Sequence, residues 1–192
     1  MKDLITLKQS LSLTDKQVLG DWLMPEDVDR AHIAKNENYV WYYAIGQYFK
    51  PKTIAEIGVK YGYSIKSLLE GAGSIYVEGY DNEIHRPGSN QIVIDRLIAL
   101  GVKHRIYNLD TQQINILTGD FDLVHVDGSH VYNDALHDMR LAWAAIKYGG
   151  IMLVDDCRYI DFVQRALQDF CKEQMVASVY LPSYRGLSMV IK

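Results

Sequence analysis

Apolar runs rich in β-branched and aromatic residues alternate with stretches of helical periodicity through most of the chain. The strand-like runs cover residues 53–57, 74–80, 104–109, 121–126 and 151–154. Helical spacing of apolar residues lies between and after them, at residues 64–69, 92–100, 133–146 and 162–174. Strands that alternate with helices predict a mainly parallel sheet with helices on both faces, a three-layer α/β/α sandwich.

The two ends of the chain depart from this alternation. Residues 175–181 and 187–191 flank a turn that contains Pro182 and Gly186, which predicts an antiparallel hairpin. Residues 1–50 have helical periodicity, with an aromatic-rich helix expected at 38–49. We expect its rings to cover the sheet, and the alternatives are a lid over a substrate or a contact between subunits. Residues 1–50 are thus predicted to be a helical cap in the same domain as residues 51–192.

The composition narrows the class of protein. A chain of 192 residues with 48% hydrophobic and 23% charged residues fits one globular domain. A formal charge of −4 argues against general affinity for nucleic acid, and the apolar runs are too short and interrupted to span a bilayer. The N-terminus lacks the apolar core of a signal peptide. Two cysteines, Cys157 and Cys171, cannot form a disulfide framework, so we expect a cytoplasmic protein.

Two pairs of glycines indicate where predicted elements end and turns begin. Gly58 and Gly62 bracket a tight turn after the first strand, and Ser64 is the expected N-cap of the next helix. Such a turn lets the backbone approach a ligand, although the pattern alone also fits a turn without one. Its spacing, Glu-x-Gly-x-x-x-Gly, differs from the dinucleotide fingerprint and from the P-loop. Gly149-Gly150 is expected to close the helix over residues 133–146.

Acidic residues stand at or near the C-terminal ends of successive predicted strands, namely Glu56, Asp81, Asp110, Asp127 and the pair Asp155-Asp156. Ligands of open α/β sheets bind at that edge. Asp81 follows the glycine turn by about 20 residues, the position from which a carboxylate accepts both ribose hydroxyls. The alternative is an Asx turn at the start of the loop. Asp110 ends a strand where a side chain reaches an adenine edge, although Asn108 or Thr111 could do the same.

The acids of the last parallel strands predict a second kind of chemistry. If Asp127, Asp155 and Asp156 converge, they raise one another's pKa, and a hard cation such as Mg²⁺ relieves this. The alternative is that Asp127 caps the next helix and Asp156 points into solvent. His130 follows closely, and its near-neutral titration suits it to take a proton from a substrate hydroxyl. The alternative role for His130 is a structural loop residue.

Over residues 53–192 the chain resembles the class I S-adenosylmethionine-dependent methyltransferases. The motifs that carry the resemblance are Glu56-Ile-Gly-Val-Lys-Tyr-Gly-Tyr-Ser64, Asp81, Asp110, Phe121-Asp-Leu-Val-His-Val-Asp-Gly-Ser-His130 and Gly149-Gly-Ile-Met-Leu-Val-Asp-Asp156. The first motif is similar to the catechol and caffeoyl-CoA O-methyltransferases, and the later ones to the macrocin and mycinamicin sugar O-methyltransferases. The resemblance implies a seven-stranded sheet with the last strand inserted antiparallel.

The resemblance also implies an activity and its residues. It implies a magnesium-dependent O-methyltransferase that uses S-adenosyl-L-methionine to methylate a hydroxyl of a sugar, a catechol or a natural-product intermediate. In this reading Asp127, Asp155 and Asp156 bind Mg²⁺, and His130 acts with Asp127 in catalysis. The residues expected to contact the cofactor are Glu56, Gly58, Tyr61, Gly62, Ser64, Asp81, Asp110 and Asp127. A homodimer or higher homo-oligomer is compatible with this family.

Other functions remain compatible with the sequence. A metal-independent N- or C-methyltransferase would use the same cofactor pocket, with the acids steering an amine. A related domain of the cephalosporin-hydroxylase type, or a Rossmann-like domain without catalysis, would not transfer methyl groups at all.

Overall fold

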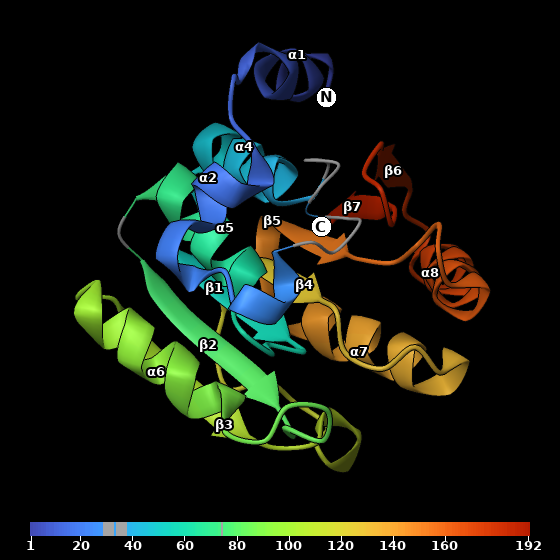
Figure 1. Cartoon of the computed structure of the whole chain (residues 1–192). Helices are drawn as coiled ribbons and strands as arrows, with labels where there is room; N and C mark the ends of the chain where they lie inside the picture. The colour runs from blue at the N-terminus through green and yellow to red at the C-terminus, as the bar shows by residue number, and fades with distance from the viewer. Residues whose placement is uncertain (29–32, 34–37, 74) are drawn as a thin grey trace.

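The computed structural model describes residues 1–28, 33, 38–73 and 75–192. Its centre is a seven-stranded sheet with the strand order β3-β2-β1-β4-β5-β7-β6 (Figure 1). The strands are β1 (Thr53–Ile57), β2 (Tyr76–Asp81), β3 (Lys103–Asn108), β4 (Phe121–Val126), β5 (Ile146–Val154), β6 (Ser178–Leu181) and β7 (Leu187–Ile191). The first five pair in parallel, whereas β7 is antiparallel to both β5 and β6. The predicted fold class is therefore confirmed.

Helices cover both faces of the sheet because successive strand residues point to opposite sides. On one face, Leu123 and Leu153 pack under α4 (Tyr39–Phe49), α5 (Tyr63–Ala72) and α6 (Ser89–Ala99). On the other face, Val124 and Val154 pack under α7 (Tyr132–Ala145) and α8 (Asp161–Gln174). Each face thus has its own apolar core. None of the described helices combines the length and apolar character needed to cross a bilayer.

The N-terminal helices α1 (Lys2–Ser10) and α2 (Asp15–Leu19) lie against α4. The buried carboxylate of Asp15 accepts hydrogen bonds from the backbone N–H groups of Asn38 and Val40, at 3.2 and 2.9 Å. It therefore supplies acceptors that the start of α4 needs. Trp41 and Tyr42, further along α4, are buried over the sheet. The short helices η1 (Gly20–Trp22) and η2 (Pro25–Asp27) follow α2.

Two local predictions at glycines are wrong. The N-cap of α5 is Gly62, in the left-handed region at φ 71°, so Ser64 lies inside the first turn. Gly149 and Gly150 lie within β5, because α7 ends at Ala145 and the chain continues directly as a strand. The extra residues are absorbed by a bulge, where the pairing of β4 with β5 shifts register between Phe121 and Leu123. Gly149 has φ 81°, a conformation typical of such irregular strands.

Helices α4 and α5 cross so closely that their backbones touch. A Cβ on Gly71 would lie 2.1 Å from the carbonyl oxygen of Tyr43, and one on Gly46 would lie 2.4 Å from that of Leu68. Real Cβ atoms do not approach carbonyl oxygens to these distances, so both positions need glycine for packing. This close crossing holds the N-terminal helices on the sheet.

Gly71→Ala should therefore destabilise the protein, although alanine is the better helix former by about 1 kcal/mol. Overpacking of a tight contact costs about 1–3 kcal/mol, and here the obstacle is backbone. We expect a lower free energy of unfolding in urea. The control is Gln168→Ala on the exposed face of α8, expected to change stability by less than about 0.5 kcal/mol. A Gly71→Ala variant more stable than the wild type would contradict the packing argument.

Candidate functional site

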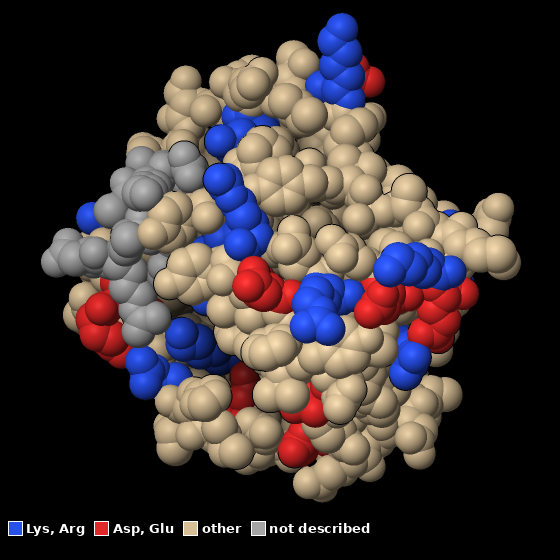
Figure 2. All heavy atoms as spheres, turned by 90° about the vertical axis from the view of Figure 1, so that its right-hand side faces the viewer, with Lys and Arg blue, Asp and Glu red and all other residues tan. Residues whose placement is uncertain are grey.

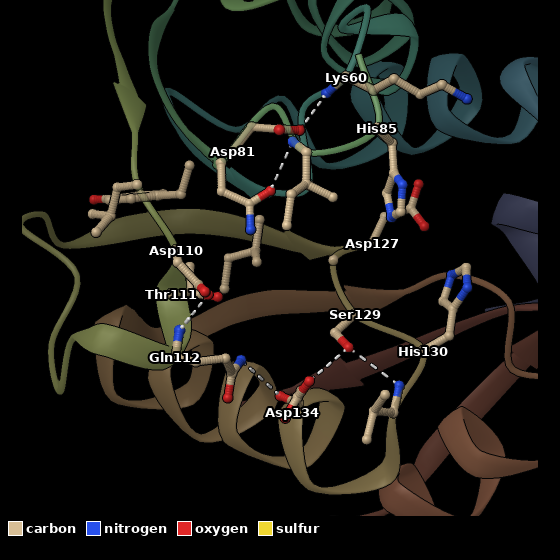
Figure 3. Close-up of a pocket in the computed structure, with 18 of the residues that line it drawn as sticks. Lys60, Asp81, His85, Asp110, Thr111, Gln112, Asp127, Ser129, His130 and Asp134 are labelled. Carbon is tan, nitrogen blue, oxygen red and sulfur yellow. Dashed lines mark hydrogen bonds between the residues drawn. The ribbon is translucent and has the colours of Figure 1, made fainter. Parts of the chain in front are cut away.

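A cavity of about 780 Å³ lies at the C-terminal ends of the parallel strands (Figure 3). Its lining combines the loops after β1, β2, β3, β4 and β5 with the loop between β6 and β7. The lining residues that matter below are Gly58, Lys60, Asp81, His85, Asp110, Thr111, Asp127, His130, Asp156 and Arg185. The cavity therefore brings Asp81 together with Asp127 and Asp156, whereas Asp155, the third predicted metal ligand, is not among the lining residues.

Gly58 forms the floor where β1 ends. Its φ is 87°, and a Cβ there would lie 2.0 Å from the carbonyl oxygen of Asp127. Its N–H donates to the carbonyl of Tyr80 at 2.8 Å, and the N–H of Asp127 donates to that of Ile57 at 2.9 Å. The ends of β1, β2 and β4 are thus tied together, and bare backbone faces the space between them.

Asp81 ends β2 and faces the cavity. One carboxylate oxygen accepts the N–H of Lys60 at 2.8 Å, and the other accepts the N–H of Glu83 at 2.6 Å. Each oxygen has a second lone pair, so the carboxylate can still accept two ligand hydroxyls. Asp110 accepts the N–H of Gln112 at 3.0 Å and thereby caps the short helix η3 (Thr111–Gln113). This cap fixes the wall of the cavity beyond β3.

The acids after β4 and β5 are crowded and largely buried. Burial raises the pKa of Asp127 well above its usual range, and the carboxylates of Asp155 and Asp156 raise it further. Burial and the charge of Asp156 also raise the pKa of Asp155. Asp155 is 7% exposed, and none of the described residues donates a hydrogen bond to its Oδ1. A buried carboxylate oxygen without a donor is stabilised when it binds a cation or a proton.

Two sets of ligand atoms in this region each lie within 4.8 Å of one another. One consists of Asp127, His130 and Asp156, and the other of His125, Asp127 and Asp155. Asp127 belongs to both. The predicted metal ligands Asp127, Asp155 and Asp156 are therefore neighbours, and each set adds an imidazole that the metal prediction did not include. Carboxylate oxygens of this kind suit a divalent cation, whereas both ring nitrogens of His125 already face Glu56 and Tyr42.

Asp156 has a partner that the sequence analysis missed. Its Oδ1 lies 2.6 Å from Nε of Arg185, and its Oδ2 lies 2.9 Å from Nε2 of His130. The predicted alternative that Asp156 points into solvent does not hold, since its side chain is 1% exposed. Arg185 comes from the β6–β7 loop. The sequence signal there is Gly186, the next residue, which adopts a left-handed backbone at φ 91°.

Four predicted cofactor residues are not among the residues that line the cavity. Glu56 is buried in β1, where it accepts hydrogen bonds from the hydroxyl of Ser64 and from Nδ1 of His125. The other ring nitrogen of His125 lies 3.0 Å from the hydroxyl of Tyr42. His125 is therefore part of a buried polar network, as expected of a structural histidine.

The other two predicted cofactor residues outside the lining, Tyr61 and Gly62, lie in the turn before α5. Tyr61 is buried in a small apolar cluster with Leu19 and Ile33, and its hydroxyl donates to Glu26 at 3.1 Å. Gly62 caps α5, and a Cβ there would meet the ring of Trp22 at 3.0 Å. Both positions pack the turn against the N-terminal helices, and neither is among the residues that line the cavity.

His85 is a second missed lining residue. It comes from the loop after β2, and Figure 3 shows its ring pointing into the space that Asp127 also faces. Nothing in the sequence paired it with a partner.

The surface seen in Figure 2 has acidic and basic side chains next to each other, rather than a large patch of one sign of charge.

Comparison with known proteins now places the chain in a family. The model of a methyltransferase domain family matches residues 55–157, more than half of the sequence. The chain belongs to this family. The match includes the glycine turn and the acids at the ends of β2, β4 and β5. It confirms the enzyme class predicted from the sequence. No curated protein matches the chain.

Solved structures share the fold over the full length of the methyltransferase chain. An O-methyltransferase from Bacillus cereus in complex with SAH is 18% identical, with a TM-score of 0.69, and the match covers 100% of this chain and 98% of that one. The SAH-bound methyltransferase PaMTH1 of Podospora anserina is 17% identical, with a TM-score of 0.64 and coverages of 99% and 93%. CalS11, a TDP-rhamnose 3'-O-methyltransferase of calicheamicin biosynthesis, is 15% identical, with a TM-score of 0.65 and coverages of 99% and 91%.

Asp138 of α7 contacts two loops that line the methyltransferase cavity, the one after β3 and the one after β4. Its Oδ1 accepts hydrogen bonds from the hydroxyl of Thr111 at 2.7 Å and from Gln112 at 3.1 Å. A Cβ on Gly128 would lie 2.8 Å from its Oδ2, so the loop after β4 rests directly on this carboxylate. Burial raises the pKa of Asp138 from 3.8 to about 6, and the bond from Thr111 partly opposes this.

The pKa of Asp138 predicts a pH-dependent stability. A carboxyl with a raised pKa binds its proton more tightly in the folded state, so its stabilising contribution is complete below about pH 4 and is lost as the pH rises through 6. Asp138→Asn removes that loss, so the variant should gain up to about 3 kcal/mol relative to the wild type between pH 4 and 7.5. Urea unfolding at both pH values measures the change. Exposed Asp120→Asn is the control, and a stability difference for Asp138→Asn that stays constant with pH would contradict the assignment.

Proposed function

We propose that this methyltransferase transfers a methyl group from S-adenosyl-L-methionine to a hydroxyl of a small molecule, with the help of a divalent cation such as Mg²⁺. One observation carries the proposal: a single cavity brings together the glycine turn with Asp81 and the acids Asp127 and Asp156. The first group suits an adenosine cofactor and the second suits a cation. A hydroxyl acceptor is supported by the structural neighbours, which include an O-methyltransferase in complex with SAH and CalS11, a TDP-rhamnose 3'-O-methyltransferase.

The residues at the β1–β3 end of the cavity fit the cofactor. Gly58 leaves backbone exposed to a ligand, Asp81 keeps free lone pairs for the ribose hydroxyls, and Asp110 with Thr111 forms the wall that an adenine would face. When bound, the cofactor supplies an electrophilic methyl group on a sulfonium. Glu56, Tyr61, Gly62 and Ser64 would act indirectly, because they hold the turn that carries Gly58.

The residues after β4 and β5 fit a divalent cation. Asp127 would be its central ligand because it belongs to both sets of ligand atoms, and Asp155 and Asp156 would complete the carboxylates. The unpartnered Oδ1 of the buried Asp155 is the structural reason to expect a positive charge there. A cation in this place supplies Lewis acidity that lowers the pKa of an acceptor hydroxyl.

His130 is the proposed base of the reaction. Its side chain is 45% exposed at the cavity, and its Nε2 lies 2.9 Å from Asp156. The carboxylate of Asp156 at this distance would stabilise the imidazolium that forms when the ring takes the proton from the acceptor. Asp127 would stabilise the positive charge that then develops on the imidazole. We further propose that the enzyme works in the cytoplasm, as a homodimer or higher homo-oligomer, on a sugar, a catechol or a natural-product intermediate.

Cofactor binding provides the first test. S-adenosylhomocysteine should raise the melting temperature of the full chain, and NADH should not. Asp81→Ala should weaken the affinity for S-adenosylhomocysteine about 10- to 100-fold in calorimetry, because a carboxylate that binds two hydroxyls is lost. Exposed Asp120→Ala is the charge-matched control and should bind like the wild type. Stabilisation by NADH alone would favour a non-methylating Rossmann-like domain and overturn the proposal.

Asp127→Ala separates the cation from the cofactor. Turnover with labelled S-adenosylmethionine and a panel of catechols and sugars should require a divalent cation and stop with EDTA. The variant should lose this cation-dependent turnover while its affinity for S-adenosylhomocysteine stays within a few fold, since Asp81 and Gly58 are intact. Equal loss of both properties, or no loss of either, would contradict the role of Asp127. Activity that resists EDTA would favour a metal-independent methyltransferase.

A further inference from the structure

Arg185 places a fixed positive charge inside the acid cluster. The side chain of Arg185 is 30% exposed, whereas that of Asp156, its partner at 2.6 Å, is 1% exposed. The second oxygen of Asp156 faces His130 at 2.9 Å. Burial lowers the pKa of Arg185, but the charges of Asp156, Asp127 and Asp155 outweigh this and raise it, so the guanidinium lies in the field of all three acids.

The backbone around Arg185 is built to hold this position. Its carbonyl accepts the N–H groups of Arg158 and Tyr159 at 3.1 and 3.0 Å. Gly186 has φ 91°, and a Cβ there would lie 2.4 Å from the backbone nitrogen of Arg158. The guanidinium carbon lies 5.5 Å from the centre of the Tyr159 ring, within range of a cation–π contact. Asp156 is itself left-handed at φ 59°, so both halves of the pair depend on special backbone.

The three acids are therefore not equally available to a cation. One set of ligand atoms, Asp127 with His130 and Asp156, includes the carboxylate that Arg185 already neutralises. The other set, His125 with Asp127 and Asp155, does not include it. A divalent cation that also recruits Asp156 must either displace the guanidinium or accept its repulsion at short range.

We infer that Arg185 is a built-in counter-ion that competes with a divalent cation for Asp156 and so weakens cation binding at this site. The inference rests on the proposed cation-assisted reaction. It follows that Asp127 and Asp155 provide the uncontested carboxylates, and that the cluster keeps partial charge compensation when the cation leaves. The cation would then be exchangeable rather than permanently bound.

Mn²⁺ binding to the full chain tests this without any activity measurement. Titration followed by electron paramagnetic resonance should give Arg185→Gln a dissociation constant about five- to tenfold lower than that of the wild type, since a competing charge is removed. Arg185→Lys keeps the charge and should stay near the wild type. The control Arg158→Gln removes an exposed arginine from the neighbouring loop, with the same change in net charge. Mn²⁺ should also raise the melting temperature of Arg185→Gln more than that of the wild type.

The outcomes separate this inference from the proposed function. Unchanged or weaker Mn²⁺ binding by Arg185→Gln, with measurable binding by the wild type, overturns the competition and leaves the cation-assisted reaction intact. Equal tightening by Arg158→Gln also overturns it, because the effect would then be one of net charge. An absence of Mn²⁺ binding by the wild type and by Arg185→Gln at millimolar concentration overturns both the inference and the proposed cation.

Discussion

Mutual repulsion between buried carboxylates is the constraint around which the site is arranged. Two like charges 4 Å apart repel by about 4 kcal/mol at an effective dielectric constant of 20. Asp127, Asp155 and Asp156 come from the ends of two adjacent strands, and the structure answers the repulsion in two ways. Burial, together with the neighbouring charges, raises the pKa of Asp127 and that of Asp155, and Arg185 and His130 contact Asp156. Each compensating group belongs to a different loop, so the cluster ties the C-terminal hairpin to the centre of the sheet.

The sheet itself made this clustering predictable from the sequence. Val126 pairs with Ile57 on one side and with Val154 on the other, so the residues that follow these positions must be neighbours. Strand β4 begins and ends where the apolar run predicts, at Phe121 and Val126. Parallel strands about 4.8 Å apart leave little freedom in where the next residue lies. Acids at strand ends are therefore placed by topology alone.

What the sequence could not supply depends on loops and on side-chain direction. Arg185 reaches Asp156 only because Gly186 and Asp156 adopt left-handed backbone, which no apolar pattern encodes. Glu56 illustrates side-chain direction: it is predicted to contact the cofactor, and its carboxylate accepts hydrogen bonds from Ser64 and His125 under α4. The period of two could have shown this, because Glu56 follows Ile54 on the face that packs against α4 and α5. The prediction that Ser64 caps α5 is wrong for a related reason. The helix begins at Tyr63, so Ser64 lies in its first turn and its hydroxyl donates to Glu56.

The aromatic helix α4 is part of the same electrostatic arrangement and more than a cover for the sheet. The hydroxyl of Tyr42 lies 3.0 Å from His125, and the indole N–H of Trp41 donates to the carbonyl of Pro182 at 3.0 Å, in the loop that carries Arg185. Burial raises the pKa of Tyr42 well above its usual range, and the charges of Asp155 and Asp127 raise it further. The rings of α4 thus keep water from one side of the acids and lower the local dielectric there. At a low dielectric a fixed charge acts more strongly than in water. The free energy needed to bring the charged groups together is spent during folding, not during the reaction. An enzyme that binds a cationic cofactor gains from this order, because its dipoles need not rearrange when the cofactor is bound.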